Sequence, residues 1–236
     1  MSTEHVMGMP VTVLADGDVA PVFAWLRWVD ATFSTYREDS QIRRLDRGEL
    51  ALRDAHPDVR EVLARCERLR VATGGYFDAR AGGPLDPSGL VKGWAVDRAG
   101  ALLRGRFCID AGGDVLVRGG PWRIGVRHPL RRDALCAALE LTDGAVATSG
   151  AYERGDHVLD PVGGGPARGA LSVTVVTGRS LATADAYATA AFAMGRQGPA
   201  WTARMRGCEA MTVLGESEVV CTAGFARHRL ALSRAA

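Results

Sequence analysis

The chain has 236 residues, of which 47% are hydrophobic and 24% are charged, and its formal net charge at pH 7 is +2. This composition is typical of a globular protein with a sizeable core. The small net charge and the scattered arginines disfavour a nucleic-acid-binding protein, because such proteins concentrate basic side chains on one surface.

Helical periodicity of apolar residues recurs along the chain, and strand-like runs lie between the periodic segments. The predicted helices span residues 20–34, 58–75, 90–104, 181–195 and 198–207. The predicted strands span residues 6–15, 106–119, 121–129, 134–150, 156–161, 170–178, 208–215 and 218–232. Glycines and a proline at 119–121 predict a hairpin between 106–119 and 121–129. This order indicates an α+β (mixed α/β) fold with antiparallel-rich sheets flanked by helices, and no linker divides it.

The N-terminal residues and the cysteines indicate the cellular compartment of the protein. The N-terminal stretch has no basic region followed by an apolar run, and no segment approaches the roughly 18 apolar residues of a membrane span. We therefore expect a cytoplasmic protein without a membrane span. The five cysteines are widely spaced and form no CxxC pair, which indicates reduced thiols and neither a disulfide framework nor a zinc site.

The loop at residues 74–97, "GGYFDARAGGPLDPSGLVKGWAVD", sets polar groups among glycines directly before a helix. Backbone N–H groups at a helix start hold anionic oxygens, and Lys92 adds positive charge there. The same spacing also fits a turn followed by Asp86 or Ser88 as a helix cap. Both interpretations stay open on these residues alone.

Two further stretches carry weaker signals. Gly112 and Gly113 lie inside the strand pattern of "CIDAGGDVLVRGG", where glycine permits a bulge or the close approach of a flat ligand, or serves packing alone. His157 in "ATSGAYERGDHVLDP" is a candidate ligand-binding or acid–base group, although a single histidine at a strand end is more often structural.

The run "LATADAYATAAFAMG", residues 181–195, places Asp185 and Thr189 one turn apart on a helix. Their oxygens therefore share one face and suit a hard cation such as Mg²⁺. The alternative is that Thr183 caps the helix, Asp185 complements the helix dipole in the first turn, and Thr189 bonds back to a carbonyl.

Taken together and in order, these stretches resemble the FAD:protein FMN transferase family, also called ApbE or flavin transferases. The resemblance runs from "VMGM" through "FSTYREDSQIRRLD", "GGYFDARAGGPLD", "DPSGLVKGWAVD", "IDAGGDVLVRG" and "TSGAYERGDHVLDP" to "TADAYATAAFAMG". It implies one two-lobed ApbE-like unit over residues 1–236. It also implies Mg²⁺-dependent cleavage of the FAD pyrophosphate, transfer of FMN to a Thr or Ser hydroxyl of an acceptor protein, and release of AMP.

The resemblance also implies the site residues. It places the metal on Asp185, Thr189 and a main-chain oxygen, that of Gly89. The residues implied to line the FAD site are Met7, Tyr36, Tyr76, Phe77, Asp78, Asp86, Lys92, His157 and Leu159. Asp185 is then catalytic through the metal, and His157 is the first candidate for a general base because its unperturbed pKa is near neutrality.

Two other functions fit the same residues. A pyrophosphatase would use water in place of the acceptor hydroxyl and release FMN and AMP. A non-catalytic FAD carrier would need the pocket but not the metal, and Asp185 and Thr189 argue against it.

Overall fold

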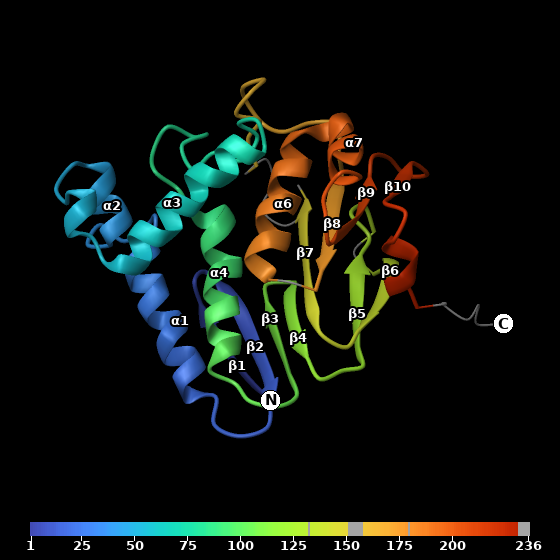
Figure 1. Cartoon of the computed structure of the whole chain (residues 1–236), viewed down its shortest axis with the longest axis horizontal. Coiled ribbons are helices and arrows are strands. Elements are labelled where there is room, and N and C mark those ends of the chain that lie inside the picture. Colours follow the sequence, from blue (N-terminus) through green and yellow to red (C-terminus); the bar gives the residue numbers. More distant parts are fainter. Residues whose placement is uncertain (132, 151–157, 179, 231–236) are drawn as a thin grey trace.

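An antiparallel sheet forms the centre of the computed structural model, which describes residues 1–131, 133–150, 158–178 and 180–230 (Figure 1). Its eight strands run in the order β1-β2-β3-β4-β7-β8-β9-β10, and β5 and β6 form a separate ribbon. The strands are β1 (Ser2–Val6), β2 (Met9–Ala15), β3 (Phe107–Ala111), β4 (Asp114–Arg118), β5 (Trp122–Arg127), β6 (Leu135–Leu141), β7 (Gly144–Gly150), β8 (Ser172–Thr177), β9 (Cys208–Val213) and β10 (Val219–Cys221). All neighbouring strands pair antiparallel, which confirms the predicted fold class.

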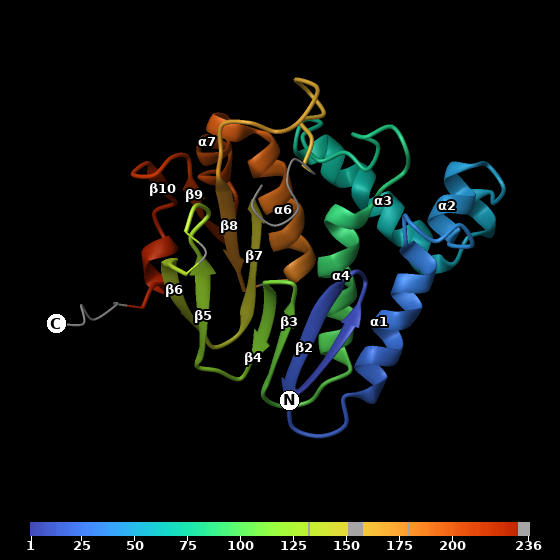
Figure 2. The same cartoon turned by 180° about the vertical axis from the view of Figure 1, so that it is seen from behind.

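The helices gather on one face of this sheet (Figures 1 and 2). They are α1 (Ala20–Phe33), α2 (Gln41–Asp46), α3 (Pro57–Ala72), α4 (Ser88–Ala101), α6 (Leu181–Ala193) and α7 (Gly198–Thr202), with short 3-10 turns η1 (Leu52–Asp54) and η2 (Gly195–Gln197). A further 3-10 turn, η3 (Phe225–His228), packs against β6. The five predicted helices are confirmed, and α2, which was not predicted, is too short to show a repeating apolar pattern. In the part of the chain that the structure describes, no helix combines the length and hydropathy needed to cross a bilayer.

The predicted first strand, 6–15, is confirmed over β2 and wrong at its start, because β1 and β2 form a hairpin. Met7 and Gly8 at its turn both have positive φ, 56° and 71°. Two consecutive residues of this kind match the tight turn that suits the twist of paired strands. Methionine is rarely found there, so the sequence carries no strong turn signal.

The predicted hairpin between 106–119 and 121–129 is also wrong. The turn lies at Gly112 and Gly113, with φ of 61° and 93°, inside the first of these runs, so β3 pairs with β4. The chain then leaves the large sheet through Gly120, whose added Cβ would lie 2.3 Å from Leu141 O. As a result β4 pairs with β7, and β5 pairs with β6.

Both faces of the central strands are buried. In β7, Ala145 and Ala147 belong to the cluster beneath the helices, whereas Val146 belongs to a second cluster under the β5–β6 ribbon. Every residue of β8 is buried for the same reason. Three layers result, and this explains why β8 is buried on both faces instead of alternating between buried and exposed residues.

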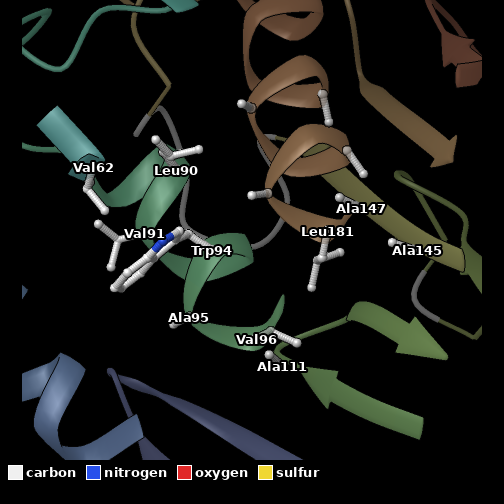
Figure 3. Packing of buried hydrophobic residues seen from close by; sticks show 14 of the residues in the cluster. Val62, Leu90, Val91, Trp94, Ala95, Val96, Ala111, Ala145, Ala147 and Leu181 are labelled. Carbon is white, nitrogen blue, oxygen red and sulfur yellow. The ribbon is translucent and has the colours of Figure 1, made fainter. Parts of the chain in front are cut away.

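The pairing of α4 with α6 is close because small residues face each other. A Cβ on Gly93 would lie 2.6 Å from the Ala182 Cα, so only glycine permits this approach. Asp97 of α4 caps α6 by accepting the N–H groups of Leu181 and Ala182 at 2.7 and 3.0 Å. Figure 3 shows Leu90 and Leu181 from the two helices, which lie in the same apolar cluster.

The N-cap of α6 is Ser180, whose hydroxyl accepts the Thr183 N–H, so the expectation that Thr183 is the cap is wrong. With this start, Asp185 lies beyond the first turn of the helix. The helix dipole falls off within the first turn, and it therefore does not account for a carboxylate at this position.

The last predicted strand, 218–232, is much shorter in the structure. Within the described part of this range, the paired strand is β10, the chain turns at Gly224 into η3, and Arg229 then forms an isolated bridge with Leu139. Glu209 of β9 holds this turn, because it accepts the Gly224 N–H at 3.0 Å and the Thr222 hydroxyl.

Candidate functional site

Four elements meet around Asp185: its own helix α6, α4, and the ends of β4 and β7. The Asp185 side chain is 3% exposed. Its Oδ2 accepts the Gly93 N–H at 3.2 Å, and its Oδ1 lies 3.5 Å from the Lys92 Nζ. A carboxylate at the centre of an alanine-rich helix therefore has one amide and one cation as partners.

Burial raises the pKa of the Asp185 carboxyl from 3.8 to about 7. The Lys92 ammonium and the Gly93 N–H lower this pKa, and the negative charge of Asp114 raises it further. Desolvation is the larger effect, because withdrawal from water disfavours the charged form of any acid. A bound cation would favour the charged form of this carboxyl and displace its proton.

Gly89 lies in the first turn of α4, and Thr189 lies in the C-terminal half of α6 next to it. A Cβ on Gly89 would lie 3.6 Å from the Thr189 Cγ2 and 3.3 Å from Phe77 Cε2. The Thr189 hydroxyl is 3.4 Å from that of Ser149 in β7. The α4–α6 pairing therefore brings the three predicted metal ligands onto facing turns.

The Gly89 carbonyl oxygen shares its expected helical donor with Asp185. In an α-helix its donor is the N–H four residues later, which here is that of Gly93. That N–H also points to Asp185 Oδ2. Sharing a donor in this way weakens the intrahelical bond and leaves the Gly89 oxygen with capacity for another partner.

The oxygen types at this position fit a hard cation. Carboxylate, hydroxyl and carbonyl oxygens are the ligands that Mg²⁺ takes, usually few from protein and the rest from water or phosphate. Within the described ranges, no group of three or more His, Cys, Asp or Glu side chains could hold a metal. A cation here would therefore depend on the hydroxyl and main-chain oxygens as well.

The sequence analysis missed Asp114, which is 2% exposed. Its Oδ1 accepts the Thr148 N–H at 3.0 Å, and its Oδ2 lies 2.5 Å from the Lys92 Nζ. The signal was available in the alternation of β4. Asp114 shares a face with Leu116, which packs against Gly100 of α4, so a carboxylate stands on the apolar, helix-facing side.

The loop before α4 holds four of the predicted flavin residues: Tyr76, Phe77, Asp78 and Asp86. Asp86 accepts the Ser88 N–H at 2.9 Å and so forms a turn. The N-cap of α4 is Pro87 and no side chain caps the helix, so the alternative that Asp86 or Ser88 is the cap is wrong. Asp78 accepts the Arg80 N–H at 2.8 Å. Tyr76 is half-buried against the core, and the Phe77 ring is buried beneath Gly89. The Phe77 ring thus supports the turn that carries Gly89.

The remaining predicted residues come from three other places. Met7 lies at the β1–β2 turn, half-buried against the main core, and Tyr36 is 92% exposed between α1 and α2. Leu159 packs on the loop before α4, since a Cβ on Gly82 would lie 3.6 Å from its Cδ1. His157 lies outside the described residues.

A cavity of about 590 Å³ lies beside this loop, between α3 and the segment around α2. Its walls are Leu45, Leu50, Leu52, Leu63, Cys66, Glu67, Arg70, Asp78, Ala79, Arg80 and Leu85. Of the predicted flavin residues only Asp78 lines it. Burial raises the pKa of the Cys66 thiol on its wall to about 12, so this cysteine is an unreactive thiol.

Comparison with known families identifies the chain. The family model described as "ApbE family" matches residues 7–84 and 79–212. The chain belongs to the ApbE family. Solved structures agree in fold: the ApbE protein of Thermotoga maritima superposes with a TM-score of 0.87 over 98% of this chain and 99% of that one, at 23% identity.

Other relatives carry names that state an activity. This ApbE-family chain is 30% identical to the FAD:protein FMN transferase of Treponema pallidum over 73% of its own length and 58% of that protein. The chain thus matches little more than half of that relative. The flavinyl transferase ApbE of Pseudomonas stutzeri, solved in its apo form, is 26% identical, with a TM-score of 0.79 over 96% of this chain and 95% of that one.

Proposed function

We propose that this chain is a Mg²⁺-dependent FAD:protein FMN transferase. It transfers FMN from FAD to a Thr or Ser hydroxyl of an acceptor protein and releases AMP. The observation that carries this proposal is the meeting of Asp185, Thr189 and Gly89 on facing turns of α4 and α6, with Lys92 on the next turn. Membership of the ApbE family supports it.

The bonds that change in this reaction are few. The acceptor oxygen attacks the phosphorus attached to the flavin side of the pyrophosphate. A new P–O ester bond forms, the anhydride P–O bond breaks, and AMP leaves with the electron pair of that bond. The hydroxyl proton passes to a base, for which His157 is our candidate because imidazole accepts protons near neutral pH.

The chain's own groups contribute positioning and charge. Asp185, Thr189 and the Gly89 carbonyl would hold Mg²⁺, which when bound neutralises charge on the pyrophosphate oxygens. Lys92 adds a second positive charge beside them, and its ammonium is partly exposed, with 26% of the side chain accessible. Asp97 and Gly93 fix α4 against α6, so these groups are in place before the substrate binds.

The test is AMP release from FAD by the purified protein, with Mg²⁺ or with EDTA. Each condition is run with and without a peptide that carries a Thr/Ser acceptor motif, and the peptide mass is measured. We expect Mg²⁺-dependent AMP release that rises with the peptide, and a peptide heavier by FMN less one water. Asp185→Asn should lose nearly all turnover, while Asp110→Asn in β3 should not.

Three outcomes would contradict the proposal. Mg²⁺-dependent AMP release without peptide labelling would indicate a pyrophosphatase. Tight FAD binding without AMP release would indicate a carrier. Full activity of Asp185→Asn would remove the metal assignment.

A further inference from the structure

Lys92 is the only lysine among the 29 Lys and Arg residues of this chain. A chain that otherwise uses arginine for positive charge keeps a compact ammonium at this one position. The two side chains are not interchangeable, because the planar guanidinium needs a wider site and spreads its charge. The surroundings of Lys92 therefore select a point charge.

Those surroundings contain two buried carboxylates at unequal distances. The Lys92 Nζ lies 2.5 Å from Asp114 Oδ2 and 3.5 Å from Asp185 Oδ1. The first distance is that of a close ion pair, and the second is that of a looser one. In this arrangement the ammonium pairs closely with Asp114 and more loosely with Asp185.

Asp114 also accepts a backbone hydrogen bond, and this structural role is distinct from its ion pair with Lys92. Its Oδ1 accepts the N–H of Thr148, which lies beyond the last residue that β4 pairs in β7. An asparagine would serve that role equally, since an amide oxygen accepts the same hydrogen bond. Only the contact with Lys92 requires a negative charge at position 114.

We propose that Asp114 is a positioning residue that holds the Lys92 ammonium away from Asp185 and so keeps Asp185 open to Mg²⁺. Without the charge on Asp114, the ammonium moves to Asp185, neutralises it and repels a divalent cation. This inference rests on the metal assignment of the proposed function. It adds a residue from β4 that accepts a hydrogen bond from the Thr148 amide and forms an ion pair with Lys92.

The test is calorimetric titration of Mg²⁺ into the metal-free full-length protein, without FAD. We expect Asp114→Asn to weaken Mg²⁺ binding about 10- to 100-fold, the usual effect of losing a group that orients a metal ligand. The matched control is Asp110→Asn. Asp110 belongs to the same hairpin and also accepts a backbone N–H, that of Gly113 at 2.8 Å, so this variant should bind as the wild type does.

A double-mutant cycle tests whether Asp114 acts through Lys92. In a Lys92→Met background the Asp114→Asn change should weaken Mg²⁺ binding at least about fivefold less than it does in the wild type, because no ammonium is left to release. An equal penalty in both backgrounds would overturn the proposal, since Asp114 would then act on the cation directly. An Asp114→Asn variant that binds Mg²⁺ as the wild type does would overturn it as well.

A second measurement needs no substitution and covers the case in which Asp114→Asn does not fold. Lysine-selective ¹⁵N labelling gives a single side-chain signal, that of Lys92. We expect a slowly exchanging ammonium signal that persists when Mg²⁺ saturates the protein. Its loss on Mg²⁺ addition would show that the cation displaces Lys92 from Asp185 and would overturn the proposal.

If the wild type binds no Mg²⁺ in the calorimeter, the metal assignment itself is wrong, and this inference is overturned with it.

Discussion

Asp185 is a carboxylate that the fold withdraws from water and then only partly compensates. A group whose pKa is higher in the folded protein than in the unfolded chain binds more protons when folded. The stabilisation linked to Asp185 is therefore complete below its unfolded value of 3.8 and is lost as the pH rises through about 7. The metal-free protein should therefore be less stable at the pH where the site would bind a cation.

This gives a prediction for the metal-free protein in EDTA. Between about pH 5 and about pH 8 the thermal midpoint of the wild type should fall more than that of Asp185→Asn, by roughly 2–4 °C for each kcal/mol lost. The amide is neutral at every pH and still offers an oxygen to the Gly93 N–H. Thermal unfolding followed by circular dichroism measures this difference, and parallel pH profiles for the two proteins would contradict it.

At the residue scale, what the sequence predicts depends on how far apart the partners are. Asp185 and Thr189 share a helix, so their spacing of one turn indicates a shared face directly. The partners of Asp114 lie on β7 and α4, and the sequence around Asp114 does not indicate which residues they are. The sequence analysis also expects Thr183 as the cap of α6, because it cannot distinguish Ser180 from Thr183 when both are good caps.

At the element scale, α4 and α6 behave as one unit. Gly93 allows their backbones to approach, and Asp97 ties the start of α6 to the side of α4. The half-buried Asp97 carboxyl has a pKa raised by desolvation, although the amides it caps lower this pKa. Capping across two helices fixes their relative position along the axis, and that position sets how Gly89 faces Thr189.

We predict that Gly93→Ala destabilises the protein by about 1–3 kcal/mol, because the added methyl would lie 2.6 Å from the Ala182 Cα. It should also weaken Mg²⁺ binding, since the facing turns move apart. Urea unfolding and calorimetry measure the two effects. The matched control is Gly178→Ala, where a Cβ meets nothing within 4 Å. A Gly93→Ala protein as stable as the control would show that α4 and α6 can move apart without loss of stability, which would contradict the prediction.

The elements also show where sequence patterns fail. The helices were predictable because their apolar periodicity is local. Hairpin partners were not, because two glycine pairs, at 112–113 and 119–120, compete as turns. The choice between them depends on tertiary packing: Gly120 lies against Leu141 O at the end of β6, and a single run of sequence does not contain that neighbour.

At the scale of the whole molecule, the sheet separates two cores. The helices and the candidate site lie on one side, and the β5–β6 ribbon covers Val146, Val176 and Met211 on the other (Figure 2). The ribbon holds no predicted site residue. Its contribution is to keep water from the second face of the strands whose ends carry the site.

Leu139→Ala tests that separation. Leu139 is fully buried in β6, and its truncation should cost about 2–5 kcal/mol through lost burial and a cavity. Mg²⁺ affinity of the folded protein should stay within about twofold of the wild type, because additivity holds between distant sites. Leu135→Ala, on the same strand with an exposed side chain, is the control and should change stability little. A large loss of Mg²⁺ affinity in Leu139→Ala would show that the two cores are linked.

The Gly93 amide reaches Asp185 across 92 residues of chain, and the Thr148 amide reaches Asp114 across 34. Contacts this distant in sequence form late, because long loops must close before the contacts contribute. During synthesis α4 and β4 emerge well before α6, so a nascent chain holds Lys92 and Asp114 together with no Asp185 beside them. On the proposed function, the oxygens of the two helices would become a cation site only when α6 docks, so Mg²⁺ would bind the finished protein rather than guide its folding.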